Sequence, residues 1–293
     1  MTELSRDTLR DALSQQGYVA DDDLISSLFL MQALGKPLLI EGDAGVGKTE
    51  AAKCLAAAHG FPLIRLQCYE GLDARQALYD WDYQRQLMAI QLAGGSQDEG
   101  SLKSAIYSED YLLRRPLLAA IASPVPVVLL IDEIDRADEE FEAFLLEVLS
   151  DFQISIPELG TFRAVSRPLV MLTSNGVREL SDALRRRCLY HYVSYPTAEK
   201  ERRIIKARLP DIDDRLGAQV VEFVQQLRRQ VLRKTPGIAE TLDWAASLGA
   251  LGVDDLRADP LTLEATLTAL IKTHEDLQQV RTQPPFKRHS QTH

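Results

Sequence analysis

Cysteines are scarce in this chain and follow no recognisable spacing. There are three, Cys54, Cys68 and Cys188, an odd number without a C-x-x-C pair. This pattern argues against a disulfide framework. Two of the three lie in apolar surroundings typical of inert core thiols. We therefore expect a reducing, intracellular environment.

Long apolar runs are also missing. The strongly apolar run at residues 127–131, behind Pro126, is too short to span a bilayer. The opening residues, MTELSRDTLRD, contain no apolar stretch of the kind found in secretory signals. These absences predict a cytoplasmic protein without membrane insertion.

Basic residues are outnumbered by acidic ones. Lys and Arg number 33 and Asp and Glu number 43, which gives a formal charge of −10 and a pI near 5.1. This balance argues against broad electrostatic binding to nucleic acid or acidic lipid, although it leaves a local basic patch open. The 293 residues, 45% hydrophobic and 26% charged, are typical of a globular protein with one large domain or two moderate ones.

A glycine-rich segment, GDAGVGKT at residues 42–49, fills every fixed position of the G-x-x-x-x-G-K-[ST] phosphate loop. It lies between an apolar run suited to a buried parallel strand, residues 38–40, and a stretch of helical character, residues 49–55. Glycines let backbone N–H groups approach phosphate oxygens closely, and the helix N-terminus adds partial positive charge. The alternative is a glycine-rich turn that merely matches the pattern.

We expect this loop to bind a nucleoside triphosphate with Mg²⁺. Lys48 would reach the β and γ phosphates, and the Thr49 hydroxyl would ligate the metal. The expected nucleotide-binding residues of the loop and its helix are Gly42, Asp43, Ala44, Gly45, Val46, Gly47, Lys48, Thr49 and Glu50.

The order of apolar and helical patterns predicts an α/β fold with a five-stranded parallel sheet, followed by an all-helical domain. Strands are expected at 38–40, 63–68, 127–131, 169–173 and 189–193, helices at 5–16, 23–34, 49–55, 109–122 and 138–150, and a hairpin at 154–156 and 161–164.

We expect the domain boundary near Pro196. Residues 1–196 would form the nucleotide-binding domain and residues 197–280 a helical domain, with helices near 218–232 and 261–274. The tail, residues 281–293, is expected to be disordered. Within the first domain we expect an insert at about 70–108, with a mobile polar loop at 94–100, and a hairpin region at about 152–165.

An acidic pair, Asp132 and Glu133, ends the third strand. In an open α/β sheet the ligand lies beyond the carboxyl ends of the strands, so this pair would face the phosphate loop. Asp132 would hold Mg²⁺ directly or through water, and Glu133 would polarise the attacking water. A solvated helix cap is the alternative, since acidic residues are common there.

Two further polar features follow the acidic pair. Asn175, the only asparagine in the chain, closes the fourth strand and could orient the attacking water or contact the γ-phosphate. Alone it would be a turn residue, because Asn-Gly is a strong turn dipeptide. The run Arg185–Arg187 ends a helix, where it could complement the helix dipole or, in a ring, enter the site of a neighbouring subunit.

In this order, these motifs resemble an AAA+ ATPase. The segment after the second strand resembles the helix-2 insert, and the hairpin at 154–164 resembles the pre-sensor hairpin, of the clade containing MoxR proteins, magnesium chelatase and dynein. The motifs DEIDRADEEFEAFLLEVLSD, IPELG and TSNGVRELSDALRRRC are similar to the MoxR branch, particularly its CoxD-like members. The resemblance covers residues 10 to 275, give or take a few at each end.

The resemblance implies an AAA+ core with a helical lid, and ATP with Mg²⁺ as ligands. Carried over, Gly42, Lys48 and Thr49 match Walker A, Asp132 and Glu133 Walker B, Asn175 sensor 1, and Arg187 the arginine finger, with Arg186 as the second choice. By family position, Tyr18 and Val19 would contact adenine, or else simply pack.

One position departs from the family pattern. The lid helix opens TPGIAET at residues 235–241 without a sensor 2 arginine, and Ala239 occupies that place. Coupling of lid to nucleotide would then use Arg233 or Lys234, or be weaker.

The resemblance implies an ATP-driven chaperone or remodelling motor, assembled as a ring of six. MoxR relatives commonly act with a von Willebrand factor A domain protein in the maturation of metalloenzymes or complexes. Insert and hairpin would contact the client or partner, or else be packing decorations, since loops tolerate sequence drift.

Other functions stay open. A nucleic-acid motor is disfavoured by the acidic charge, although a pore lined by basic residues would escape a whole-chain count. A nucleotide-binding scaffold without turnover is disfavoured by the presence of both Glu133 and Asn175. A GTPase needs an N-K-x-D motif, whereas Asn175 is followed by glycine, and small-molecule kinases lack the adjoining Asp-Glu pair.

Overall fold

The computed structural model describes residues 5–93, 99–283 and 285, which divide into two compact units. The first unit holds residues 5–12, 21–41 and 49–192. The second holds residues 13–20, 42–48 and the described residues from 193 onward. The expected domain boundary at residue 196 stays a prediction, although the division found here lies near it.

A five-stranded parallel sheet forms the centre of the fold and confirms the expected class. Its strands lie in the order β2 (Leu63–Gln67), β5 (Val128–Asp132), β8 (Leu169–Ser174), β1 (Leu38–Gly42) and β9 (Leu189–Val193). All residues of β5 and β8 are buried, as expected for central strands covered on both faces, and this explains why both strands are apolar up to the polar residues at their carboxyl ends.

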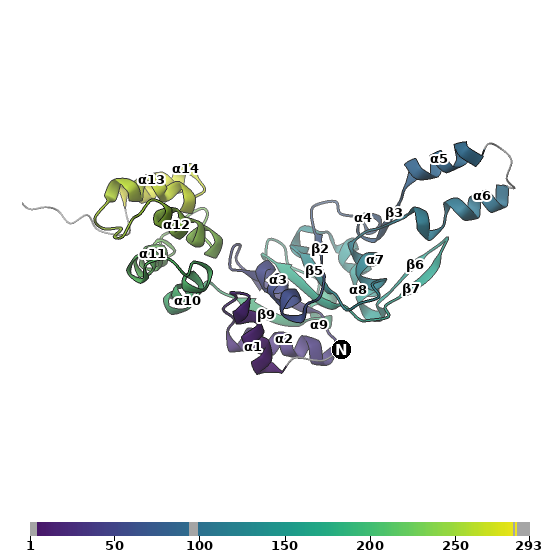
Figure 1. Ribbon diagram of the computed structural model, residues 1–293, viewed down its shortest axis with the longest axis horizontal. Helices are drawn as coiled ribbons and strands as arrows, with labels where there is room; N and C mark the ends of the chain where they lie inside the picture. Colours follow the sequence, from purple (N-terminus) through teal and green to yellow (C-terminus); the bar gives the residue numbers. More distant parts are fainter. Residues whose placement is uncertain (1–4, 94–98, 284, 286–293) are drawn as a thin grey trace, which may run out of the picture. The chain divides into compact units, whose positions relative to one another are not determined.

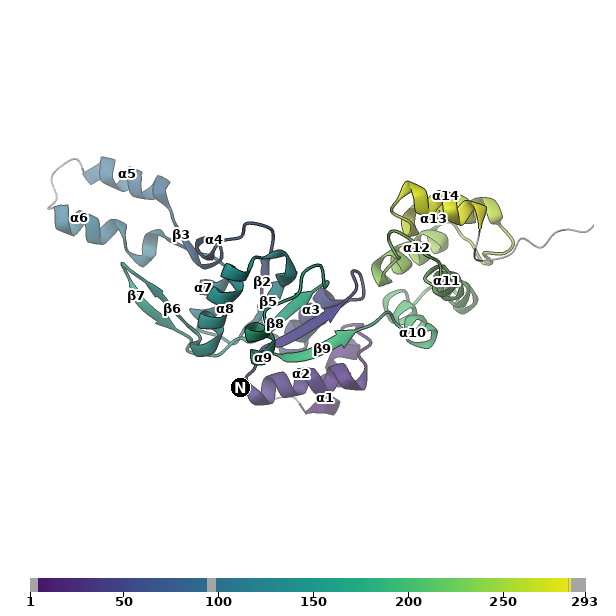
Figure 2. The same cartoon turned by 180° about the vertical axis from the view of Figure 1, so that it is seen from behind.

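Helices cover the sheet of the first unit (Figures 1 and 2). Leu129 and Ile131 of β5 join one apolar cluster with Leu117 and Leu118 of α7 (Pro116–Ile121) and Leu145 of α8 (Glu139–Asp151). The other helices of this part of the chain are α1 (Arg6–Gln15), α2 (Asp22–Leu34), α3 (Lys48–His59) and α9 (Asp182–Arg187).

The insert is a helical hairpin on a small two-stranded sheet. It contains α4 (Ala74–Leu78), β3 (Tyr79–Trp81), α5 (Tyr83–Ala93), α6 (Glu99–Ile106), the short 3-10 helix η1 (Glu109–Tyr111) and β4 (Leu112–Arg114). Strands β3 and β4 are antiparallel, and α5 and α6 extend away from the parallel sheet (Figures 1 and 2). Most of the loop expected to be mobile, residues 94–98, lies outside the described residues.

The single long helix expected at 109–122 is wrong. The segment instead forms η1, then β4, and only then α7, which begins at Pro116. A proline cannot donate a helical hydrogen bond and disfavours helical geometry at the residue before it, so Arg115 adopts an extended conformation at the N-cap of α7. Pairing of Leu112 with Trp81 gives the preceding residues a strand partner.

The expected hairpin is confirmed as β6 (Gln153–Ile156) and β7 (Gly160–Arg163), which pair antiparallel. Another 3-10 helix, η2 (Ile134–Arg136), follows β5 directly. It begins immediately after the acidic pair and therefore sets the path of the chain at the end of the strand.

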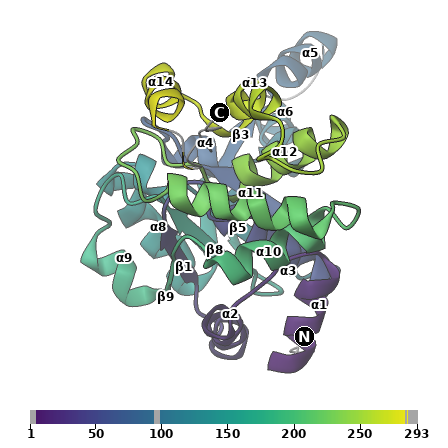
Figure 3. The ribbon, with the colours of Figure 1, turned by 90° about the vertical axis from the view of Figure 1, so that its left-hand side faces the viewer.

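Past β9, the described part of the second unit is helical, as expected (Figure 3). The helices are α10 (Ala198–Arg208), α11 (Asp214–Leu227), α12 (Ile238–Ala250), α13 (Pro260–Leu270) and α14 (His274–Thr282). They share a core in which Phe223 and Trp244 are fully buried, with ring centroids 4.9 Å apart. Helix α14 takes in residues 281 and 282 of the expected disordered tail, while residues 286–293 lie outside the described residues.

A membrane-crossing helix would need a long and strongly apolar segment. Among the described residues, no helix meets both requirements.

Candidate functional site

The phosphate loop connects β1 to α3 and is shaped by its glycines. A Cβ on Gly42 would lie 2.1 Å from the carbonyl oxygen of Val193, so no side chain fits there. Gly47 has a φ of 97°, a conformation that glycine adopts without steric cost. Local geometry therefore requires glycine at two of the fixed positions of the motif.

Lys48 is buried and aims back along its own loop. Its Nζ donates to the carbonyl oxygens of Gly42 and Asp43, both at 2.7 Å. A buried ammonium group needs such partners, because desolvating an unpaired charge is costly. The arrangement keeps a positive charge next to the backbone that would hold the phosphates.

Thr49 and Asp132, the two residues expected to bind the metal, are in direct contact. The Thr49 hydroxyl donates to Asp132 Oδ1 at 3.0 Å. The carboxylate is almost completely buried and also accepts a hydrogen bond from the Thr173 hydroxyl of β8. Three segments far apart in sequence, α3, β5 and β8, therefore meet at this carboxylate.

Asp132 forms an ion pair with an arginine of the neighbouring strand. Arg65 of the adjacent strand β2 donates to Asp132 Oδ2 from Nη2 at 2.6 Å and from Nε at 3.0 Å. Mg²⁺ is commonly bound through one or two carboxylates together with phosphate oxygens and water. The donor set of Thr49 and Asp132 fits that chemistry. Within the described ranges, no group of three or more His, Cys, Asp and Glu side chains could hold a metal by itself, so the phosphates would have to complete the coordination.

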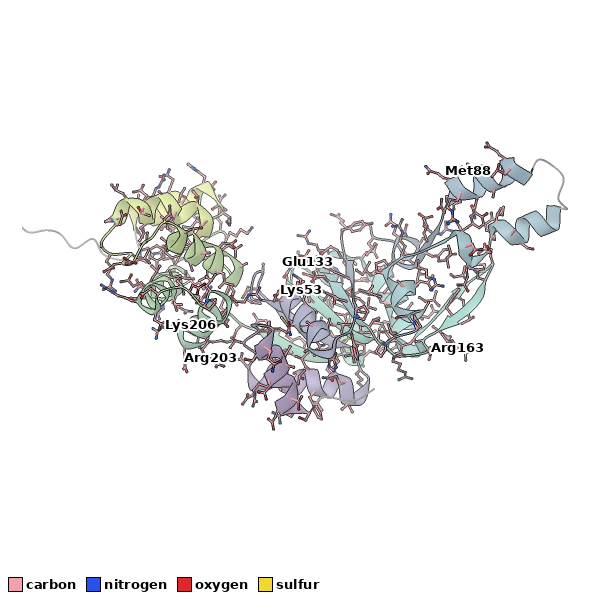
Figure 4. All side chains as sticks on the ribbon, viewed as in Figure 1. Lys53, Met88, Glu133, Arg163, Arg203 and Lys206 are labelled. Carbon is pink, nitrogen blue, oxygen red and sulfur yellow. The ribbon has the colours of Figure 1, made fainter. Side chains whose placement is uncertain are left out.

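Glu133 has an unusual backbone for a non-glycine residue. Its φ and ψ are 56° and 49°, in the left-handed region, which costs about 1–3 kcal/mol and is characteristic of functional positions. Its N–H donates to Thr173 Oγ1 at 2.9 Å, and its carboxylate pairs with Arg136 Nε at 3.0 Å. The side chain is partly exposed (Figure 4). Thr173 thus contacts both members of the acidic pair.

Asn175 follows the last residue of β8, next to the strand that carries the acidic pair. In the β5–β8 register Ile131 lies opposite Leu172, so the ends of the two strands lie side by side. The Asn175 N–H donates to Asp135 Oδ2 at 3.1 Å. The structure thus brings Thr49, Asp132, Glu133 and Asn175 to the carboxyl end of one sheet.

The three arginines of α9 have different surroundings. Arg185 pairs with Glu41 at 3.2 Å. Arg187 donates from Nη1 to the carbonyl oxygen of Leu146 at 2.8 Å and to Ser150 Oγ at 2.7 Å, although much of its side chain is exposed. Arg186 is exposed and makes no hydrogen bond or ion pair with other described residues. Both candidates for the arginine finger therefore lie at the surface.

Residues near the start of α12 contact the phosphate loop through their backbone. The N–H of Ile238, which begins α12, donates to the carbonyl oxygen of Gly45 at 2.8 Å. A Cβ on Gly237 would lie 2.7 Å from the Cα of Gly45. Ala239 follows in the first turn of α12, whereas Arg233 pairs with Glu275 of α14 at 3.1 Å. Lys234 donates its N–H to Asp276, also of α14.

Of the two residues expected at adenine, Tyr18 approaches the phosphate loop. Its hydroxyl donates to the carbonyl oxygen of Gly47 at 3.4 Å, within the second unit. Val19 is partly buried. Contact with adenine stays a prediction for both.

Sequence patterns did not indicate Arg65, Thr173, Asp135 and Glu142. Asp135 and Glu142 are buried, but both belong to the highly charged segment DEIDRADEEFE, so the sequence does not distinguish them from exposed charges. Arg65 lies between apolar residues of β2, and Thr173 follows the apolar residues of β8, so both look like ordinary strand positions.

Cys68 lies close to the acidic residues and is inert. Burial, followed by the negative charges of Asp132, Asp135 and Glu133, raises the pKa of its thiol to about 12. The thiol is therefore protonated at neutral pH, and the expectation of an unreactive core cysteine agrees with this environment.

Similarity to known proteins agrees with this arrangement. The chaperone MoxR1 of Mycobacterium tuberculosis is 30% identical over 193 residues, which are 64% of this chain and 44% of MoxR1. The denitrification regulatory protein NirQ of Stutzerimonas stutzeri is 26% identical over 216 residues, or 71% of this chain and 69% of NirQ. This chain therefore spans less than half the length of MoxR1.

A mutant RuvB of Thermotoga maritima has a similar fold, with a TM-score of 0.50 and 21% identity over 92% of this chain and 75% of that one. The model of the AAA domain of the dynein-related subfamily matches residues 37–188. This span covers more than half of the chain and runs from β1 through the phosphate loop, β5 and β8 to the arginines of α9. The chain therefore belongs to the dynein-related subfamily of AAA domains, within the AAA+ ATPases.

Proposed function

We propose that this protein is a Mg²⁺-dependent ATPase that drives a MoxR-type chaperone or remodelling activity. The observation that carries the proposal is the hydrogen bond between Thr49 and Asp132. It joins the helix that follows the phosphate loop to the strand that ends in the acidic pair. The similarity to a protein named chaperone MoxR1 supports the chaperone class.

The proposed roles follow from the chemistry of each group. The backbone of residues 42–47, Lys48 and the following residues 49 and 50 bind the triphosphate, and Thr49 with Asp132 holds Mg²⁺. Bound Mg²⁺ would neutralise charge that develops on the phosphates. Glu133 accepts a hydrogen bond from the attacking water and polarises it. Asn175 orients that water through its side-chain amide.

Each member of the acidic pair forms an ion pair with an arginine. Arg65 pairs with the carboxylate of Asp132, and Arg136 pairs with the carboxylate of Glu133. Binding of Mg²⁺ and nucleotide would require at least one Asp132 oxygen to turn toward the metal. Arg136 and Glu133 are both partly exposed, so water can replace that contact at low cost. Asp132 is buried, so Arg65 would leave it only as the charge of the metal takes its place.

We further propose a ring, with six subunits as the expected number, in which Arg187 enters the neighbouring site. Its exposure on α9 supports this role. Its two hydrogen bonds to α8 within the same chain would have to be broken or shared. Arg186, exposed and without partners among the described residues, is the alternative.

Arg187→Ala is expected to lower kcat by about 10³-fold, because an arginine finger stabilises charge on the γ-phosphate in the transition state. Arg186→Ala, with the same change of charge on the same helix, is the matched control. Phosphate release is measured for each variant after ring assembly has been verified by analytical ultracentrifugation. Wild-type hydrolysis by an assembled Arg187→Ala ring would exclude the role, and a large loss in Arg186→Ala alone would assign it to Arg186.

We propose that the partner is a protein. A von Willebrand factor A domain protein is the expected partner, and the two would act together in the maturation of a metalloenzyme or protein complex. Helix α5 supports a protein-binding surface, because its apolar side chains face solvent (Met88 is labelled in Figure 4). The exposed apolar residues of α5 are Tyr83, Leu87, Met88, Ile90 and Leu92. Exposed apolar clusters of this kind mark protein interaction sites.

Met88→Glu combined with Leu92→Glu is expected to reduce partner binding severalfold, since two charges would have to be desolvated at the contact. Partners are captured with ATP-bound Glu133→Gln protein, with and without the α5 changes, and quantified by mass spectrometry. Leu251→Glu combined with Leu261→Glu, at two apolar residues outside α5 of similar exposure, is the control. Equal recovery of every captured protein with and without the α5 changes would contradict this surface.

A further inference from the structure

Asp135 is a buried carboxylate whose hydrogen bonds all lead to one loop. It lies in η2, three residues after Asp132, and only 3% of its surface is exposed. Its Oδ2 accepts the N–H of Asn175 at 3.1 Å and the N–H of Val177 at 2.9 Å. Its Oδ1 is buried without a hydrogen-bond partner among the described residues.

Such a carboxylate is costly to maintain. Burial of an ionised group is tolerated only when hydrogen bonds compensate it, and here the compensation comes from two backbone donors of the segment that follows β8. Because one oxygen receives both donors, a shift of the loop would weaken both hydrogen bonds together. The position of residues 175–177 is thereby tied to the position of η2.

The loop itself is tightly turned. Gly176 has a φ of 72° and donates its N–H to Ser174 Oγ at 3.1 Å. The N–H groups of residues 175, 176 and 177 therefore all have acceptors. One oxygen of Asp135 accepts two of these three hydrogen bonds, so that carboxylate is the main anchor of the turn.

The next part of the chain has a separate anchor. Glu142 of α8, fully buried, accepts the N–H of Ser181 at 2.9 Å and pairs with Arg178. Arg178 also donates to the carbonyl oxygen of Ala137 at 2.7 Å. Residues 178–181 thus remain attached when Asp135 is removed, and the loss is confined to residues 175–177.

We propose that Asp135 is a positioning residue for Asn175. It rigidly couples the loop that carries the water-orienting amide to the strand that carries Asp132 and Glu133. This inference rests on the proposed ATPase function, because Asn175 needs a reaction to act on. A misplacement of about 1 Å at such a group can cost about 10²-fold in rate, so a backbone anchor without substrate contact is sufficient to affect kcat.

The test compares Asp135→Ala, Asp135→Asn, Asn175→Ala and the double variant Asp135→Ala with Asn175→Ala. Steady-state kcat and KM for ATP, the dissociation constant of a fluorescent ATP analogue, and the melting temperature are measured for each. Asp138→Ala is the control, because Asp138 caps α8 through the N–H of Phe141 and, among the described residues, makes no hydrogen bond or ion pair with residues 175–177. This variant shows how far kcat and the melting temperature change when the segment after β5 is weakened at a position that does not hold residues 175–177.

Asp135→Ala is expected to lower kcat by about 10–100-fold with an unchanged dissociation constant for the analogue. Asp135→Asn keeps an acceptor oxygen and should recover most of the loss. In the background of Asn175→Ala, removal of Asp135 should have little further effect on kcat, because the two residues act through one group.

The proposal is overturned if Asp135→Ala and the wild type have equal kcat, or if the effects of Asp135→Ala and Asn175→Ala multiply. Should Asp135→Ala fail to fold, the same cycle is made with Asp135→Leu and Asn175→Ala, because leucine has a similar shape and removes both acceptor oxygens; a wild-type kcat or multiplying losses again contradict the proposal. Failure of the proposed function looks different: the wild type itself would release no phosphate, whatever the state of Asp135.

Discussion

Lys48→Ala is expected to weaken nucleotide binding severely. The ammonium group is buried next to the carbonyl oxygens of Gly42 and Asp43 and is the expected partner of the β and γ phosphates. Charge-assisted hydrogen bonds of this kind are each worth about 1.5–3 kcal/mol, so we expect affinity to fall by at least about 10²-fold. Equilibrium titration with a fluorescent ATP analogue measures the change.

Lys53→Ala is the matched control for that result. Lys53 lies on the same helix, is half exposed and pairs with Glu50 at 3.3 Å, so its loss should leave nucleotide affinity close to that of the wild type. Thermal unfolding gives an independent readout, because ligand at 100 times its dissociation constant stabilises the wild type by about 2.7 kcal/mol. A Lys48→Ala protein that is stabilised by ATP as strongly as the wild type would contradict the proposed role.

Glu133→Gln is expected to slow hydrolysis strongly and to leave ATP bound. The amide keeps the size of the side chain but cannot take up a proton or polarise water as a carboxylate does, and general-base catalysis contributes about 10²–10⁴-fold. We therefore expect a loss of kcat in that range with no loss of affinity for the ATP analogue. Single-turnover phosphate release and equilibrium binding measure the two effects separately.

The control for this second change is Glu140→Gln, which makes the same substitution at an exposed position in the first turn of α8. Its kcat should match the wild type. If Glu133→Gln hydrolyses ATP as fast as Glu140→Gln, Glu133 does not act on the attacking water. The left-handed backbone at Glu133 would then need another explanation.

Much of the fold was predictable from the sequence, for a physical reason. Central parallel strands are buried on both faces, so β5 and β8 are continuous apolar runs that stand out from their surroundings. The hairpin of β6 and β7 was marked by its turn residues. The helix expected at 109–122 was wrong because its periodic apolar residues outweighed Pro116, which in the structure begins a helix rather than continuing one.

The candidate site was predictable only where a motif records it. Lys48, Thr49, Asp132 and Glu133 stand at fixed spacings, and the structure brings Thr49 and Asp132 into contact. Asp135 accepts hydrogen bonds from backbone N–H groups 40 and 42 residues further along the chain. Every non-proline residue has such a group, so no pattern of side chains reveals the partner.

The two arginines near the acidic pair were missed for a different reason. Arg65 reaches Asp132 because β2 and β5 are neighbours in the sheet, with Gln67 opposite Asp132. The order of strands in the sheet depends on how the strands assemble. The alternation of side chains along β2 does not indicate which strand lies beside it. Arg136 pairs with Glu133 across a 3-10 turn that the sequence had not indicated.

The central claim is that this chain hydrolyses ATP with Asp132 holding Mg²⁺ and Glu133 acting on water. The most direct test is the rate of phosphate release from ATP by the purified protein as Mg²⁺ is titrated, run beside Glu133→Gln. The account predicts release that rises with Mg²⁺ to a plateau in the wild type and stays at background in Glu133→Gln, with both proteins binding the ATP analogue. Absence of release by wild-type protein that binds ATP and Mg²⁺, or equal release by both proteins, would contradict it.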